Sequence, residues 1–113
     1  MRTTEKSTAL FHLAEKYVPG ASGTGSKRAK YAPDEPGIIV RGEGCRVWDA
    51  DGNAYIDFRN GLGPVTLGYR FPEVDAAIRD QLERGVVFGH PCPLEAEVAR
   101  TLTELVPAAE KVR

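Results

Sequence analysis

The apolar residues near the N-terminus recur at intervals of three and four, which is the spacing of one face of an α-helix. This pattern predicts an amphipathic helix over about 7–18, with apolar positions at Leu10, Leu13, Ala14, Tyr17 and Val18. Pro19 follows, and because proline disfavours helical geometry in the residue before it, we expect the helix to end there. The next stretch, 21–36, is rich in Gly, Ser, Lys and Pro, so we expect a polar loop that lies over another part of the fold.

Between residues 37 and 58 the pattern changes to short runs rich in β-branched and aromatic residues, which favour strands. The runs are 37–41, 45–49 and 54–58. Asp51-Gly52 separates the last two, and this pair supplies the positive φ values that a tight hairpin needs. The segment 37–58 is therefore predicted to be a three-stranded antiparallel meander.

Gly61, Gly63, Pro64 and Gly68 mark a glycine-rich loop, 61–68, whose backbone can approach a ligand or another chain closely. Two further helices are predicted after this loop. The first covers about 72–84 and has one apolar face, made of Val74, Ile78 and Leu82. The second covers about 93–106, and its apolar positions are Leu94, Val98, Leu102 and Leu105. A proline stands at or near the start of each helix, where its missing amide proton costs nothing. The expected fold class is α+β: an N-terminal helix, the meander and two helices.

Composition narrows the classes of function. The chain has 113 residues, with 15 Lys plus Arg against 16 Asp plus Glu, which suits one globular unit and gives no basic footprint for nucleic acid. Its apolar runs fall far short of the roughly 20 residues that cross a bilayer, and the N-terminus is too polar for a signal peptide. We therefore expect a cytoplasmic protein with no nucleic-acid or membrane partner. Cys45 and Cys92 lie far apart and are expected to be reduced.

Four short stretches imitate known sites but have simpler interpretations. The stretch 20–27 nearly matches a phosphate-binding loop, yet no strand precedes it and its final residue pair is transposed. The stretch 61–64 does not match a dinucleotide fingerprint, because Pro64 lacks an amide donor. The stretch 49–53 resembles a calcium loop but fits a hairpin turn better. The stretch 90–92 offers too few ligands for a metal and is interpreted as a loop that leads into a helix.

Three cations lie in the polar loop: Lys27, Arg28 and Lys30. A planar guanidinium could hold a substrate carboxylate with two parallel hydrogen bonds. Composition alone favours the simpler interpretation, in which the cluster is a solvated loop face.

Many short matches in a fixed order carry a resemblance to a known family. They are Leu10-Phe11, Val18-Pro19-Gly20, the run 47–57, Gly63-Pro64, Leu67-Gly68, Pro72-Glu73-Val74, the run 88–91, Leu94-Glu95, Val106-Pro107 and the run 110–113. Together they resemble the N-terminal segment of the class III aminotransferases, closest to proteins like glutamate-1-semialdehyde 2,1-aminomutase. The resemblance covers nearly the whole chain.

The resemblance implies the opening segment of a fold type I enzyme that depends on pyridoxal 5'-phosphate and is a homodimer when complete. In that family the phosphate loop and the Schiff-base lysine would follow Arg113, and none of the five lysines here occupies a cofactor position. We therefore expect no catalytic or cofactor-binding residue in 1–113 and only weak cofactor binding. Whether the chain is itself an enzyme is left open. A free-standing, non-catalytic interaction or dimerisation module is the alternative.

The resemblance also implies a substrate site. Ser26 and Arg28 are similar to a serine and an arginine that bind substrate in the aminomutase, and Leu62 stands where the aminomutase has an aromatic residue. Tyr69 and Arg70 replace a stretch that commonly contains histidine in the family. We expect a small amino or carbonyl substrate, with glutamate semialdehyde and other carbonyl or amino-sugar compounds equally open. A metal site is not expected.

Overall fold

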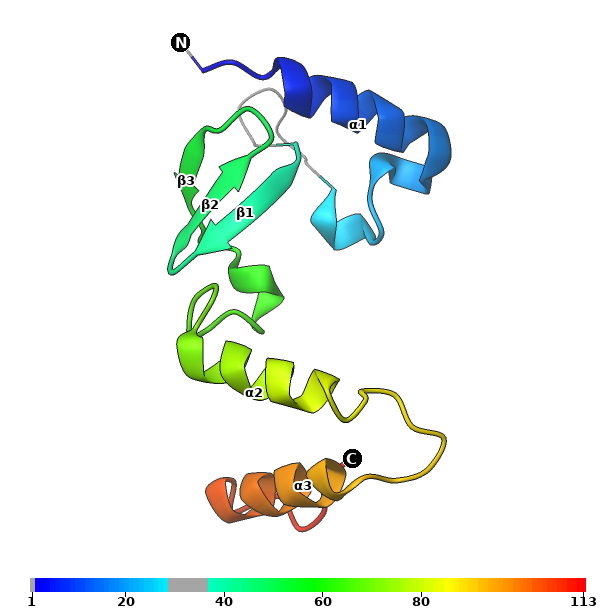
Figure 1. Cartoon of the computed structure of the whole chain (residues 1–113), viewed down its shortest axis with the longest axis vertical. Coiled ribbons are helices and arrows are strands. Elements are labelled where there is room, and N and C mark those ends of the chain that lie inside the picture. Colours follow the sequence, from blue (N-terminus) through cyan, green and yellow to red (C-terminus); the bar gives the residue numbers. More distant parts are fainter. Residues whose placement is uncertain (1, 29–36) are drawn as a thin grey trace. The chain divides into compact units, whose positions relative to one another are not determined.

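The computed structural model describes residues 2–28 and 37–113, which fall into two compact units, Met1–Asp75 and Ala76–Arg113. The α-helices are α1 (Glu5–Tyr17), α2 (Pro72–Leu82) and α3 (Pro93–Leu105). The strands are β1 (Ile39–Glu43), β2 (Arg46–Asp49) and β3 (Ala54–Ile56), and three short 3₁₀ turns are η1 (Pro19–Ala21), η2 (Gly25–Lys27) and η3 (Asn60–Leu62). Figure 1 shows these helices and the antiparallel sheet of order β1-β2-β3, so the predicted α+β class is confirmed.

Helix α1 begins with a cap from a distant part of the chain. Thr4 precedes the helix without a capping hydrogen bond from its side chain. Instead, the Lys6 and Ser7 amides donate to the two carboxylate oxygens of Asp51, at 2.9 and 2.8 Å. The helix ends at Tyr17, and Val18 before the proline is extended, with φ of −124°. This ending follows the restriction that proline places on the residue before it.

The turn between β2 and β3 is organised by a buried carboxylate. Asp49 is 1% exposed and accepts hydrogen bonds from the Asp51 amide, the Asn53 amide and side chain, and the Tyr55 hydroxyl, at 2.8 to 3.0 Å. Burial alone would raise the pKa of Asp49, but the hydrogen bonds from Asn53 and Tyr55 lower it below its ordinary value. The stretch that imitates a calcium loop is therefore the predicted hairpin turn, with its inner carboxylate satisfied by N–H and O–H donors.

The sheet has a small core. Val47 pairs with Gly42 on one side and Tyr55 on the other, and among the described residues it is the one apolar side chain that is buried, at 6% exposure. A β-bulge lies between Ile39 and Arg41. The Arg41 guanidinium lies 4.4 Å from the Trp48 ring centroid, a cation–π contact across the paired strands.

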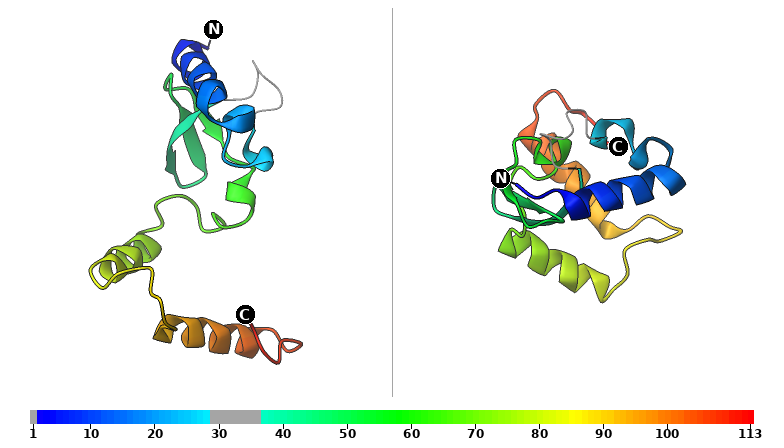
Figure 2. Two further views of the ribbon diagram at one scale, coloured as in Figure 1. Left: turned by 90° about the vertical axis from the view of Figure 1, so that its right-hand side faces the viewer. Right: turned by 90° about the horizontal axis from the view of Figure 1, so that it is seen from above.

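Helix α3 has clear boundaries of its own. The Glu95 carboxylate accepts from the Cys92 amide at 3.3 Å just before the helix, and Val106 donates back to Leu102 at 2.9 Å at its end. Its predicted apolar face, Leu94, Val98, Leu102 and Leu105, is 39% to 72% exposed. No described residue of α2 or α3 is buried. Figure 2 shows the ribbons of both helices, α2 in yellow-green and α3 in orange. Neither helix, nor any other in the described part of the chain, is long and apolar enough to cross a membrane.

Candidate functional site

An open cavity of about 640 Å³ lies within the unit Met1–Asp75. Its walls come from η2, from all three strands and from the segment that runs from β3 through η3. Polar and charged groups on the walls are Ser26, Lys27, Asp57 and Arg59. Two tyrosines, Tyr55 and Tyr69, and a group of aliphatic and aromatic side chains, Ile39, Val47, Ile56, Phe58 and Leu62, complete the larger part of the lining. The cavity lining thus combines apolar side chains with two cations, Lys27 and Arg59.

One wall of the cavity is a turn with unusual backbone geometry. Asn60, Gly61 and Leu62 follow one another with φ of +54°, +58° and +66°. The left-handed region costs a side chain such as leucine roughly 1 kcal/mol or more. The turn is held by the Leu62 amide, which donates to the Arg59 carbonyl at 2.8 Å, and by the Gly63 amide, which donates to that of Asn60 at 2.9 Å. Strain of this kind gathers at ligand sites, and here it sets Leu62, 64% exposed, beside the cavity.

Asp57 fixes both ends of the glycine-rich loop. One carboxylate oxygen accepts from the Arg59 and Asn60 amides at 2.7 and 3.1 Å, and the other accepts from the Tyr69 hydroxyl at 2.7 Å. Burial would raise the pKa of Asp57, but the hydrogen bonds, that of Tyr69 foremost, lower it below its ordinary value. The same hydrogen bond, helped by burial, raises the pKa of Tyr69. Asp57 is therefore an anion at neutral pH and a poor proton donor.

Tyr69 is anchored on the sheet by its backbone as well as by its hydroxyl. It exchanges two backbone hydrogen bonds with Gly44, at 3.0 and 2.9 Å, which makes an isolated bridge at the end of the β1–β2 hairpin. Its ring lies against Gly42, where a Cβ atom would come within 2.9 Å of three ring carbons. The close approach therefore requires glycine at position 42. Tyr69 therefore joins the loop to the sheet.

The structure brings two of the three predicted substrate residues to the cavity. Ser26 and Leu62 line it, whereas Arg28, which is exposed, is not among the lining residues. Of the other loop cations, Lys27 lines the cavity and Lys30 lies outside the described residues. Whether any of the three predicted residues contacts substrate stays a prediction.

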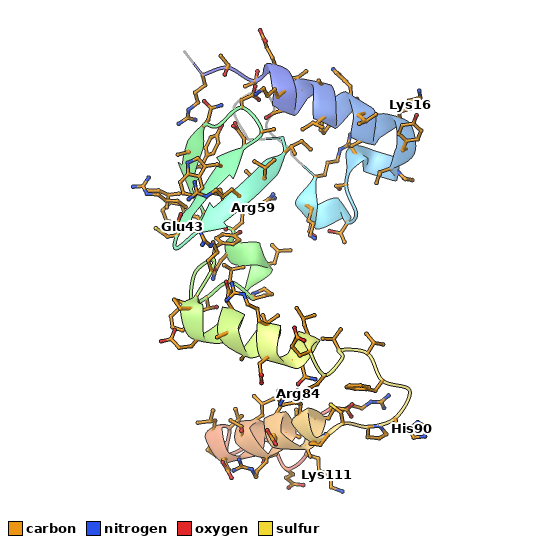
Figure 3. The ribbon with its side chains drawn as sticks, viewed as in Figure 1. Lys16, Glu43, Arg59, Arg84, His90 and Lys111 are labelled. Carbon is orange, nitrogen blue, oxygen red and sulfur yellow. The ribbon has the colours of Figure 1, made fainter. Side chains whose placement is uncertain are left out.

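Sequence reasoning missed Asp57 and Arg59. Asp57 is the first residue after β3 and Arg59 the third, and both precede the glycine-rich loop. Loops that follow a strand often carry the residues that line a site, so this position was an available signal. The Arg59 side chain also reaches another segment, because its Nη2 donates to the Ser26 carbonyl oxygen at 3.2 Å. Figure 3 shows Arg59 beside the sheet.

Among the residues that the structure describes, no α-helix contributes to the cavity lining, so no helix N-terminus offers free amides to an anion there. The Asp57 carboxylate is already engaged by three donors. Across 2–28 and 37–113, no group of three or more His, Cys, Asp or Glu side chains is suited to a metal ion. His90 lies close to its neighbour's carbonyl, with Nδ1 2.7 Å from the Gly89 oxygen.

A family model and the curated relatives both place this chain among aminotransferases and related enzymes. The family Aminotransferase class-III matches residues 29–113. The glutamate-1-semialdehyde 2,1-aminomutase of Thermus thermophilus is 41% identical over 107 residues, which are 95% of this chain and 25% of that protein. The chain thus spans about a quarter of the length of the curated relatives it matches.

Solved structures that are similar to this chain in fold are also transaminases. An omega-transaminase from Sphaerobacter thermophilus superposes with a TM-score of 0.81 at 33% identity, over 93% of this chain and 23% of that one. A beta-phenylalanine aminotransferase from Variovorax paradoxus superposes with a TM-score of 0.81 at 32% identity, over 96% and 25%. The chain therefore has the fold of the corresponding quarter of these transaminases.

Proposed function

Because the chain belongs to the class III aminotransferases, a family that depends on pyridoxal phosphate, we propose that residues 1–113 are the N-terminal portion of an aminotransferase or aminomutase. The observation that carries the proposal is the family match over 29–113 together with the partial coverage of every relative named above. In such enzymes the cofactor acts as the electron sink for amino transfer. This portion would supply contacts to substrate and dimer surface rather than the reacting groups, in a cytoplasmic homodimer.

We propose a small amino or carbonyl substrate that carries an anionic group, and the cations in the cavity lining support this proposal. Ser26 and Leu62 would contact the substrate from the cavity walls. Arg28, two residues after Ser26 and outside the lining, would hold the carboxylate of the substrate with its guanidinium. Leu62 offers an apolar surface where the aminomutase has an aromatic ring, which leaves room for side chains other than that of glutamate semialdehyde. The names of the relatives, an aminomutase, an omega-transaminase and a beta-phenylalanine aminotransferase, cover this range.

Cofactor binding tests the proposal. The isolated chain is expected to bind pyridoxal phosphate only weakly and to be inactive, and borohydride should fix no stoichiometric cofactor on any lysine. A protein in which the reading frame continues past Arg113 into a phosphate loop and a reactive lysine should bind one cofactor per subunit. Stoichiometric fixation on the 113-residue chain would contradict the proposal, and a chain that genuinely stops at Arg113 would favour a non-catalytic module.

The substrate loop has its own test in the longer protein. Arg28→Ala is expected to raise KM by about tenfold or more and to leave kcat nearly unchanged, because a carboxylate is held equally in the ground and transition states. Lys30→Ala is the comparison variant and should raise KM far less, since a point charge holds a planar anion less well than a guanidinium. Equal, small effects at both positions would show that the cations only solvate the loop.

A further inference from the structure

We propose that Arg59 is a positioning residue that ties the segment 22–28 to the sheet and so holds Ser26 in place as one wall of the cavity. The inference rests on the proposed function for its meaning in catalysis, because Ser26 is a proposed substrate contact. The hydrogen bond between Arg59 and Ser26 belongs to this chain whether or not Ser26 contacts a substrate.

The geometry that carries the proposal is a connection between two distant segments. Arg59 Nη2 donates to the Ser26 carbonyl oxygen at 3.2 Å, across 33 residues of sequence, and both residues line the cavity. Apart from this bond, the hydrogen bonds that the segment 22–28 makes with other described residues are local: the Ser22 hydroxyl donates to the Thr24 carbonyl, and the Lys27 and Arg28 amides donate to the carbonyls of Thr24 and Gly25. Local bonds shape a loop but do not fix it relative to the sheet.

The other side of the tie is rigid. The Arg59 amide donates to Asp57 at 2.7 Å, Asp57 accepts from Tyr69 at 2.7 Å, and Tyr69 is bonded to Gly44 in the sheet. The Arg59 backbone is therefore connected to the sheet through a chain of hydrogen bonds by way of Asp57 and Tyr69. This bond is solvent-exposed, and it joins a charged donor to a carbonyl in a distant segment, so it biases the position of the loop.

The backbone and side chain of Arg59 have separate roles, which makes the proposal testable. Arg59→Met keeps the amide that donates to Asp57 and removes only the guanidinium. Arg59→Lys keeps a cation that can reach a carbonyl and should restore part of the effect. Arg41→Met is the matched control, because Arg41 contacts Trp48 and Glu43 and neither lies in the segment 22–28.

The experiment measures amide hydrogen exchange on the 113-residue chain. Arg59→Met is expected to speed exchange at the Lys27 and Arg28 amides by about tenfold relative to the unchanged chain, with slower exchange again in Arg59→Lys. Exchange at Tyr69 and Gly44 should stay unchanged. No acceleration in Arg59→Met, or an equal one in Arg41→Met, would overturn the proposal.

A second measurement separates the tie from the proposed function. In the longer protein, Arg59→Met should raise KM several-fold with kcat retained, because the loop is less often in place to receive substrate. Faster loop exchange with an unchanged KM would support the tie and remove the substrate role of the loop. A raised KM without faster exchange would show that Arg59 contacts substrate directly, which would overturn the positioning role.

Discussion

Gly42 and Tyr69 show how one residue without a side chain determines how closely a loop packs. The Tyr69 ring lies where a Cβ of residue 42 would be, and the ring cannot move away freely, because Gly44 holds its backbone and Asp57 its hydroxyl. A methyl group here must displace a side chain that is fixed at both ends. The cost of such crowding is typically about 1–3 kcal/mol.

We expect Gly42→Ala to lower the free energy of unfolding by about 2 kcal/mol, measured by urea denaturation. Gly23→Ala is the control, since a Cβ there would meet nothing within 4 Å, and it should change stability little. If the two variants were equally stable, the Tyr69 ring would have to be free to move.

Asp57 makes stability depend on pH in a defined direction. Its pKa in the folded chain lies below the ordinary value of 3.8, so its contribution is fully present above about pH 4 and is lost as pH falls through the folded value. Tyr69→Phe removes the foremost of the hydrogen bonds that lower this pKa.

Tyr69→Phe should therefore raise the Asp57 pKa, cost about 1 kcal/mol at pH 7 and flatten the loss of stability in acid. An NMR titration of the Asp57 carboxyl carbon, with unfolding curves at neutral and acid pH, checks all three effects. Tyr17→Phe, at an exposed tyrosine, controls for loss of a hydroxyl. An unchanged Asp57 titration in Tyr69→Phe would contradict this account.

At the scale of elements, the β2–β3 turn also serves α1. Asp51 accepts from the second and third amides of the helix, and the Asn53 side chain donates to the Thr3 carbonyl at 2.7 Å. A carboxylate at a helix N-terminus satisfies amides that have no partner in the helix and interacts favourably with its dipole. The hairpin turn thus fixes the start of the helix that leads to the segment 22–28.

Asp51→Ala should fray the first turn of α1, with faster exchange at Lys6 and Ser7 and a loss of helical circular dichroism. Asp51→Asn keeps an acceptor and is expected to lose less. Asp80→Ala, which removes an exposed ion pair with Arg84 near the end of α2, is the control and should leave α1 unchanged. Equal exchange at Lys6 in all three variants would show that α1 does not need this cap.

At the scale of the whole molecule, apolar surface exceeds what the described residues cover. The α3 face formed by Leu94, Val98, Leu102 and Leu105 is exposed along its length, and the corresponding α2 residues, Val74, Ile78 and Leu82, are 42% to 57% exposed. Contiguous apolar surface of this kind promotes association in water.

The isolated chain should therefore self-associate, which sedimentation velocity would detect as a mass that rises with concentration. Replacing Val98 and Leu102 together by Glu should shift the chain toward monomer. Ala96→Glu, on the opposite face of the same helix, is the control. A monomer at all concentrations with cooperative unfolding would instead indicate a self-contained module.

The sequence by itself determined the elements and the family. Helical spacing, Pro19 after an extended residue, and Asp51-Gly52 in a hairpin act through neighbours along the chain, so they can be read without knowing the fold. The ordered short matches identified the class III aminotransferases for the same reason, since they need only sequence order. Ser26 and Leu62, taken from that resemblance, do line the cavity.

Only the tertiary structure decided which distant residues meet. The Asp51 cap spans 44 and 45 residues, and the Arg59 tie to Ser26 spans 33. Neither Asp57 nor Arg59 carries a periodicity or a motif that marks its partner, and Arg28 lies off the cavity lining although its neighbour Lys27 lies on it. Contacts between side chains and distant segments depend on the path of the backbone between the two residues, which local propensities do not specify.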